Sequence, residues 1–423
     1  MCQAADHPPG PSPRELPLLD LRRYTAPADP SDRAEFVLAL RAACRDPGFL
    51  QLTGHGVPTS LTDRVLAVSR EFFRLPTATK LRIENVHSPH FRGYTRLGQE
   101  ITRGNPDLRE QIDIGDERPR RVCGPGDPPY LRLDGPNQWP AQPAELRAAV
   151  EEYMAALAGV ARVLVRALAE SLGLAPDHLD ATFADDPRSH LKLLRYLPAP
   201  DGPAAETGRG AGLGAGDGDG ARADPHRRDA DAARSQGVGA HKDGGFLSLV
   251  LQDTVRRQDA PDAPGASEDP EGSEGSEGSP NATDPAWLPG LQVADGSGGW
   301  IDAPPVPGAI VVNIGEMFEL ATLRYYPATV HRVMSPPPGH ERGSVAFFFG
   351  PGLSATIEPV PLPPALLAQI PAAGPPDPDN PIFAQHGENT LKSWLRSHPE
   401  VARRHYADLT RPDGATRPDG AAR

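Results

Sequence analysis

The chain has 423 residues and a formal net charge of −13, and it contains only three, widely spaced cysteines. This acidic balance, without a basic stripe carrying interleaved aromatic residues, argues against nucleic acid as a partner, and the cysteines are too few for a disulfide framework or a zinc cluster. No apolar run reaches the roughly 18 residues of a membrane-spanning helix, and the first ten residues lack an apolar leader segment. We therefore expect a cytoplasmic monomer without a membrane partner.

The N-terminal half is predicted to be mostly helical. Ser31 and Asp32 open one helix that runs toward Cys44, and Ser60 with Asp63 opens a second one that stops at Pro76. A long apolar stripe at helical spacing predicts a third helix that packs across the outside of a sheet. Its members are Leu146, Val150, Tyr153, Leu157, Val160, Leu164, Leu168 and Leu172.

Two stretches interrupt the C-terminal half and are expected to be disordered surface insertions. Residues 199–239 are almost entirely Gly, Ala, Asp, Arg and Pro, and residues 256–285 contain an acidic Glu-Gly-Ser repeat. Neither stretch has enough apolar side chains to offset the entropy of ordering it. The tail, residues 371–423, is expected to hold one helix around Asn389–Leu395 and then a disordered polar repeat.

A His-x-Asp triple, His241 and Asp243 around Lys242, precedes the short apolar run Phe246–Leu251, which is typical of a buried strand. In a strand, His241 and Asp243 would share one face and Lys242 would face away. His331 lies in a second strand-like stretch and completes a set of two imidazoles and one carboxylate. Such a set leaves three positions of an octahedral ion open, as in non-haem Fe(II) oxygenases, whereas zinc favours a closed tetrahedral set or a single open position.

Arg342 begins a run in which alternate residues are apolar. Arg342 and Ser344 are expected on one face of a strand, with Val345, Phe347 and Phe349 on the other. A guanidinium binds a carboxylate through two parallel hydrogen bonds and stays charged at all relevant pH. The pair Arg342 and Ser344 therefore predicts a site for a carboxylate ligand.

Together these residues resemble the Fe(II)- and 2-oxoglutarate-dependent dioxygenases of the isopenicillin N synthase type, and two stretches look most like the bacterial and fungal branch. The stretches that carry the resemblance are Leu16–Leu21, Gly48–Val57, Phe72–Pro76 with Lys80, Arg92–Tyr94, Asp107–Gly115 and Gly308–Glu316. The resemblance implies a mainly β fold with flanking helices. Its parts would be an N-terminal region at 14–125, a double-stranded β-helix (jelly-roll) core at 140–360 with the two insertions, and the C-terminal segment 371–423.

The resemblance also implies roles for individual residues. His241, Asp243 and His331 would bind the iron, and Arg342, Ser344 and Tyr196 would hold the distal carboxylate of 2-oxoglutarate. Leu194 departs from many plant members, which have an asparagine there. The implied reaction uses Fe(II), 2-oxoglutarate and O2 to oxidise a small organic substrate by hydroxylation or a related C–H oxidation, and it releases succinate and CO2.

The substrate and the reaction outcome stay open at this point. The chain is similar to an ethylene- and succinate-forming enzyme around Glu100, which stands where that enzyme has a glutamate near its arginine substrate, but Lys192 replaces one of its functional arginines. Glu100, Lys192 and Phe348 are the candidate substrate residues. The alternatives are that ethylene-forming activity, an isopenicillin N synthase-like oxidase without 2-oxoglutarate, and a barrel that only binds an acid.

Overall fold

The computed structural model describes residues 15–199, 236–254, 256–257, 290–371 and 380–410. Most of the two expected insertions and the polar repeat at the end of the chain lie outside these residues. The expected boundaries of the two insertions were wrong at one end each. Residues 236–239 belong to strand β8 (Gln236–His241), and Arg256–Arg257 form strand β10, which pairs with β15 (His340–Gly350).

The start of β8 was not predicted from the sequence, because its glycines resemble those of the low-complexity segment before it. A Cβ on Gly237 would lie 3.0 Å from the carbonyl oxygen of Val333, and one on Gly239 would lie 2.8 Å from the Thr102 side chain. Glycine is thus required here by close packing of the strand against its neighbours, not by flexibility.

Within the described residues, most strands form two sheets and pair antiparallel, except for the parallel pair β1–β2. The larger sheet has the order β1 (Leu18–Asp20), β2 (Phe49–Thr53), β13 (Ile310–Ile314), β9 (Leu247–Gln252), β15, β7 (Arg188–Tyr196), β6 (Arg109–Gly115) and β3 (Gly93–Thr95). The smaller sheet has the order β12 (Trp300–Ala303), β11 (Leu291–Ala294), β14 (His331–Met334) and β8. A short hairpin of β4 (Ile101–Thr102) and β5 (Asn105–Pro106) lies beside β8.

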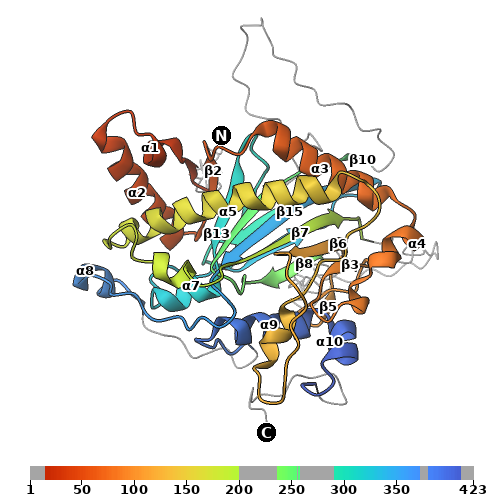
Figure 1. The fold of residues 1–423 in the computed structure, drawn as a ribbon. Coiled ribbons are helices and arrows are strands. Elements are labelled where there is room, and N and C mark those ends of the chain that lie inside the picture. Colours follow the sequence, from red (N-terminus) through yellow and green to blue (C-terminus); the bar gives the residue numbers. More distant parts are fainter. Residues whose placement is uncertain (1–14, 200–235, 255, 258–289, 372–379, 411–423) are drawn as a thin grey trace, which may run out of the picture.

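Two long helices, α3 (Thr59–Arg74) and α5 (Leu146–Ser171), lie along the larger sheet, and α2 (Pro30–Arg45) packs against α5 and the edge strands β1 and β2 (Figure 1). The apolar stripe therefore predicted α5 correctly. The helix expected from Ser31 is also confirmed as α2, and Asp29 caps it. Ser60 is not a cap, because α3 begins one residue earlier and Leu61 N already donates to Pro58 O over 2.9 Å.

The remaining helical segments are short or belong to the C-terminal part. They are α1 (Arg22–Thr25), α4 (Thr77–Lys80), η1 (Leu81–Ile83), η2 (Asn85–His87), η3 (Pro129–Leu133), η4 (Asp180–Phe183), α7 (Glu316–Ala321), α8 (Pro364–Leu367), α9 (His386–Ser397) and α10 (Pro399–His405). The helix expected at Asn389–Leu395 is thus confirmed and extends further, whereas α10 was not expected. None of the described helices is long and apolar enough to span a membrane.

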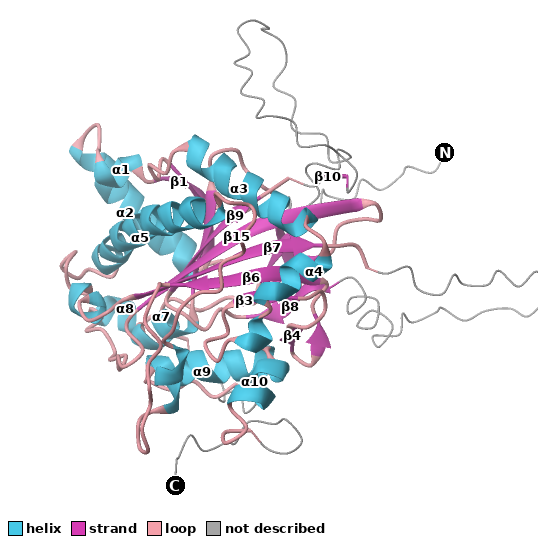
Figure 2. Cartoon of the chain, turned by 45° about the vertical axis from the view of Figure 1, so that its right-hand side comes forward, coloured by secondary structure: helices cyan, strands magenta, loops and turns pink. Residues whose placement is uncertain are grey.

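The alternation predicted for β15 is confirmed, and it separates two cores. Val345, Phe347 and Phe349 pack toward the helices, while Ala346 packs into the layer between the two sheets. A third cluster joins α9 and α10 to the rest (Figure 2), with the Phe91 ring stacked between Trp394 and Tyr406, each at 5.4 Å. This packing holds the C-terminal helices α9 and α10 against the rest of the fold.

Candidate metal centre and cavity

His241 and His331 come together by strand pairing. They are register partners in the antiparallel pair β8–β14, and their ring centroids lie 4.2 Å apart. Phe49 packs edge-on against the His331 ring at 5.0 Å between centroids. Residues that lie opposite each other in an antiparallel ladder have neighbouring side chains, so the two imidazoles share one face of the smaller sheet.

Asp243 completes the set, although it does not lie in a strand as expected. β8 ends at His241, and Asp243 lies in the connection to β9, so strand alternation is the wrong reason for its position. Its Oδ1 is 3.6 Å from His241 Nε2 and 3.7 Å from His331 Nε2. Lys242 instead donates to Glu319 Oε2 over 3.0 Å.

The second carboxylate oxygen of Asp243 is already occupied. Ser248 Oγ donates to Asp243 Oδ2 over 2.6 Å, and Asn313 Nδ2 donates to the same atom over 2.7 Å. Ser248 and Asn313 are themselves register partners between β9 and β13. Burial would raise the pKa of Asp243, but the neighbouring imidazoles and these donors hold it well below its usual range. Asp243 therefore presents one ionised oxygen, Oδ1, to the two rings.

Backbone carbonyls orient both imidazole rings. His241 Nδ1 lies 2.7 Å from Gly239 O, and His331 Nδ1 lies 3.2 Å from Thr329 O. A carbonyl only accepts, so each Nδ1 carries a hydrogen that it donates to the backbone, and each Nε2 is the ring nitrogen left to bind a metal. Burial also lowers the pKa of His331 to about 4, which leaves its ring neutral at pH 7.

These three side chains fit a divalent metal ion. One atom from each lies within 4.8 Å of the others, and no other such group of three occurs among the described residues. Two imidazole nitrogens and one carboxylate oxygen suit iron in the 2-His-1-carboxylate arrangement, which leaves positions open for other ligands. The predicted triad is therefore brought together, by strand pairing on one side and a short loop on the other.

Arg342 lies between the two sheets and is buried without an ion-pair partner among the described residues. Its guanidinium stacks over the Tyr196 ring at 4.8 Å, and Nη1 lies 3.3 Å from Gln252 Oε1. The Tyr196 hydroxyl lies 3.2 Å from Ser344 Oγ. Burial of an unpaired cation is costly, which marks this as a place for an anionic ligand. The three residues predicted to bind a carboxylate are thus neighbours.

A large cavity of about 1350 Å³ opens beside the metal centre. His241 and Asp243 line it, and so do all three candidate substrate residues, Glu100, Lys192 and Phe348. Arg342, Ser344 and Tyr196 are not among the described residues that line it, because they lie deeper between the sheets.

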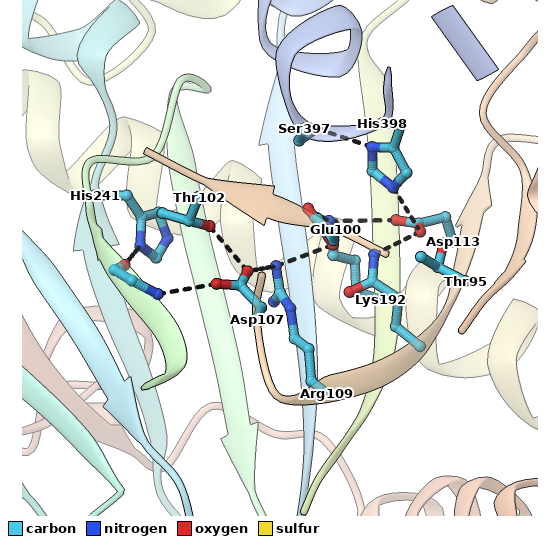
Figure 3. A network of polar contacts seen from close by, with 12 residues as sticks. Thr95, Glu100, Thr102, Asp107, Arg109, Asp113, Lys192, His241, Ser397 and His398 are labelled. Carbon is cyan, nitrogen blue, oxygen red and sulfur yellow. Dashed lines mark hydrogen bonds and ion pairs between the residues drawn. The ribbon is translucent and has the colours of Figure 1, made fainter. Parts of the chain in front are cut away.

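One wall of this cavity is a network of buried charges (Figure 3). Lys192 Nζ lies 2.8 Å from Glu100 Oε1 and 3.5 Å from Asp113 Oδ1, and Arg109 Nη2 lies 3.0 Å from Glu100 Oε2. Burial would raise the pKa of Glu100, but Arg109 and Lys192 outweigh this and lower it to about 2. His190 Nε2 lies 3.0 Å from Asp113 Oδ1.

The C-terminal helices contribute to the same wall. The Trp394 ring of α9 lies 5.2 Å from Lys192 Nζ and 4.9 Å from the His190 ring. His398, between α9 and α10, points toward Asp113 with 3.8 Å between Nε2 and Oδ2 (Figure 3). Burial lowers the pKa of His398, so its ring is neutral and the contact is not a charged pair.

Sequence reasoning missed Arg109, Asp113, His190, Trp394 and His398 as residues of this site. A signal was present for two of them, since Arg109 and Asp113 lie on one face of a strand whose seven residues are all buried. Charged side chains in a fully buried strand indicate a polar network or a ligand site.

Comparison with known protein families gives two matches. Residues 16–142 match the model of the non-haem dioxygenase in morphine synthesis N-terminal region, and residues 279–351 match that of the 2OG-Fe(II) oxygenase superfamily.

Among characterised relatives, homoarginine-6-hydroxylase 2-ODD-C23.1 of Arabidopsis thaliana is 31% identical over 82% of this chain and 88% of its own. The 2-oxoglutarate-dependent dioxygenase frbJ of Dothideomycetidae sp. (strain 11243) is 31% identical over 91% of this chain and 90% of its own.

Solved structures have the same fold. Neurospora crassa T7H in complex with alpha-KG and thymine matches with a TM-score of 0.59 at 21% identity, over 93% of this chain and 97% of that one. A Caulobacter crescentus protein assigned to the 2OG-Fe(II) oxygenase family matches with a TM-score of 0.59 at 25% identity, over 89% of this chain and 98% of that one.

Proposed function

The chain belongs to the 2OG-Fe(II) oxygenase superfamily and is a 2-oxoglutarate-dependent dioxygenase, and we propose which of its residues carry out the reaction. His241, Asp243 and His331 bind Fe(II). Arg342, with Ser344 and Tyr196, binds the distal carboxylate of 2-oxoglutarate. The two sheets form the double-stranded β-helix that holds these residues in place.

One observation supports this assignment most strongly. Three potential ligand atoms lie close together, and the other polar atom of each side chain already has a hydrogen-bond partner. Asp243 Oδ2 is occupied by two donors and both imidazole Nδ1 atoms face carbonyls, so only Oδ1 and the two Nε2 atoms remain for the metal. When bound, Fe(II) and 2-oxoglutarate supply the oxidising power, with succinate and CO2 as products.

The protein's own residues supply anchoring and exclusion of water. Arg342 fixes one end of the cosubstrate by a charge-assisted, two-pronged contact. Apolar side chains around it, among them Val238, Val293 and Val333, keep the layer between the sheets dry. In such surroundings the attraction between a guanidinium and a carboxylate is stronger than in water.

We infer that the prime substrate is a small molecule with charged or strongly polar groups, held at Glu100, Lys192 and Phe348. Among the described residues, Glu100 Oε2 and Arg109 Nε have no hydrogen-bond partner, although Arg109 and Glu100 are in ionic contact. A ligand with both donors and acceptors would satisfy such groups. Several relatives are homoarginine-6-hydroxylases, which supports an amino acid with a cationic side chain as the first candidate.

The test is an aerobic incubation of the Fe(II)-loaded protein with 2-oxoglutarate, with and without homoarginine or arginine, followed by assays for succinate, hydroxylated amino acid and ethylene. We expect succinate in all samples and more of it, with a hydroxylated product, when the right substrate is present. Ethylene in the headspace would instead support the ethylene-forming alternative. Substrate oxidation without consumption of 2-oxoglutarate would support the oxidase and contradict the role given to Arg342.

A further inference from the structure

Asp107 connects the charged cavity wall to the strand that carries a proposed metal ligand. It lies just before β6, is fully buried, and is surrounded by donors from three segments. Thr102 Oγ1 donates to Oδ2 over 2.8 Å, and Arg109 Nη2 lies 3.2 Å from the same oxygen. Gln236 Nε2 donates to Oδ1 over 3.0 Å, and Gly239 N donates to Oδ1 over 3.1 Å.

Gly239 links Asp107 to the proposed metal ligand His241 through two hydrogen bonds. Gly239 gives its N–H to Asp107, and its carbonyl accepts from His241 Nδ1 over 2.7 Å. Both polar groups of this one residue are therefore in use, one toward the cavity wall and one toward the imidazole. Figure 3 shows Asp107 and Arg109 between His241 and Glu100.

β8 depends on this contact because it is an edge strand. On one side it pairs with β14, with register shifts between His331 and Met334. Within the part of the chain that the structure describes, no strand of the smaller sheet pairs with its other side. That open side is held by Asp107 and by the bond from Leu108 N to Gln236 O, which is 3.0 Å long. An edge strand with interrupted pairing has few bonds that fix its position.

We propose that Asp107 is a positioning residue for His241, which it orients through the peptide groups of Gly239. The inference rests on the proposed metal role of His241. Asp107 also connects the proposed metal centre with the proposed substrate site, because Arg109 contacts both Asp107 and Glu100. A ligand that engages Glu100 is thereby linked to the orientation of a metal ligand through a chain of buried contacts.

The test is a titration of the metal-free full-length protein with Co(II), followed by its visible absorption, for the wild type and four variants. We expect Asp107→Ala to weaken Co(II) binding roughly tenfold, the lower end of the effect of losing an outer partner of a metal ligand, and to change the band shape. Asp107→Asn keeps an oxygen for Gly239 N and is expected to bind Co(II) nearly as the wild type does.

Glu110→Ala is the matched control. Glu110 is a buried acid in the same segment, with donors from Lys80, Tyr94 and Arg195, but it lies on the opposite face of β6. Its loss should lower stability and leave Co(II) affinity unchanged. Gly239→Ala is the fourth variant. Its Cβ would lie 2.7 Å from Gln236 Nε2 and 2.8 Å from Thr102 Cγ2, so it would disturb two side chains that donate to Asp107 while keeping Asp107 itself.

The outcomes separate the two proposals. A wild type that binds no Co(II) would overturn the metal site itself. Wild-type affinity in Asp107→Ala, or an equal loss in Asp107→Ala and Glu110→Ala, would overturn the positioning role. If Asp107→Ala does not fold, weak binding in Gly239→Ala together with retained binding in Asp107→Asn supports the role, and unchanged binding in Gly239→Ala contradicts it.

Discussion

His331 stands directly opposite His241 in the ladder between β14 and β8, which brings their ring centroids to 4.2 Å. The antiparallel pairing thus brings together two of the three proposed metal ligands. The orientation of the third, Asp243, depends on the donors that contact its Oδ2.

Removing the donors to Asp243 should weaken metal binding without unfolding the protein. In Asn313→Ala and Ser248→Ala, Oδ2 loses a partner and the carboxylate is free to turn, so we expect roughly 10- to 100-fold weaker Fe(II) binding. Anaerobic Fe(II) titration measures this. Ser171→Ala removes a buried serine at the end of α5 that contacts Tyr326 and none of the proposed metal ligands, and it serves as a control that should keep wild-type affinity. Unchanged affinity in both site variants would contradict the orienting role.

A methyl group at Gly290 should mimic the loss of Arg342. A Cβ on Gly290 would lie 1.9 Å from Arg342 Nη1, so Gly290→Ala must displace the guanidinium. We expect Gly290→Ala and Arg342→Ala to bind 2-oxoglutarate roughly 100-fold more weakly, as is typical when one partner of a buried charge pair is lost, and to keep Fe(II).

Gly159→Ala is the control for this pair. Gly159 lies in α5 and has nothing within 4 Å of its added Cβ, so alanine should be neutral or slightly stabilising there. The measurement is calorimetric titration of the Fe(II)-loaded proteins under anaerobic conditions. Wild-type 2-oxoglutarate affinity in Arg342→Ala would refute the assignment of the carboxylate site.

Stability should fall in mild acid because of a buried histidine that is not one of the proposed metal ligands. Burial lowers the pKa of His386 to about 4, below its usual value of 6.5. Between these values the unfolded chain binds the proton and the folded one does not, so stability is full above pH 6.5 and decreases as pH falls toward 4. At pH 5 the loss from this residue is about 2 kcal/mol. Denaturant unfolding of the wild type and of His386→Gln at pH 7 and pH 5 tests this, and an equal loss in both proteins would contradict it.

Lys192 should matter for stability as well as for the substrate. Lys192→Met leaves Glu100 and Asp113 buried without this shared cation, and breaking such a pair typically costs about 3 kcal/mol or more. Lys192→Arg keeps the charge and should lose less. Urea unfolding compares the two variants, and Fe(II) binding should be the same in both. A Lys192→Met protein as stable as the wild type would show that the network contributes little.

The sequence allowed the local features to be predicted, because they depend on spacing within one element. The stripe from Leu146 to Leu172 predicted α5, and alternation from Arg342 to Phe349 predicted the two faces of β15. The metal triad was also predicted, although Asp243 reaches the site from a loop and not from a strand.

The contacts between residues of the charged cavity wall could not be predicted from local patterns. Asp113 and Lys192 are register partners between β6 and β7, and this pairing depends on contacts between distant parts of the chain. The start of β8 was missed for another reason, since the glycines that close packing requires there look the same as those of the low-complexity segment before them.

We propose that this centre binds Fe(II) through His241, Asp243 and His331 and binds 2-oxoglutarate through Arg342. The most direct test is anaerobic addition of 2-oxoglutarate to the Fe(II)-loaded protein while its visible charge-transfer absorption is recorded, in the wild type, Asp243→Ala and Arg342→Ala. We predict a saturable band in the wild type, no band in Asp243→Ala, and a band in Arg342→Ala only at much higher 2-oxoglutarate. A wild type without a band, or a band that is unchanged in Asp243→Ala, would contradict the account.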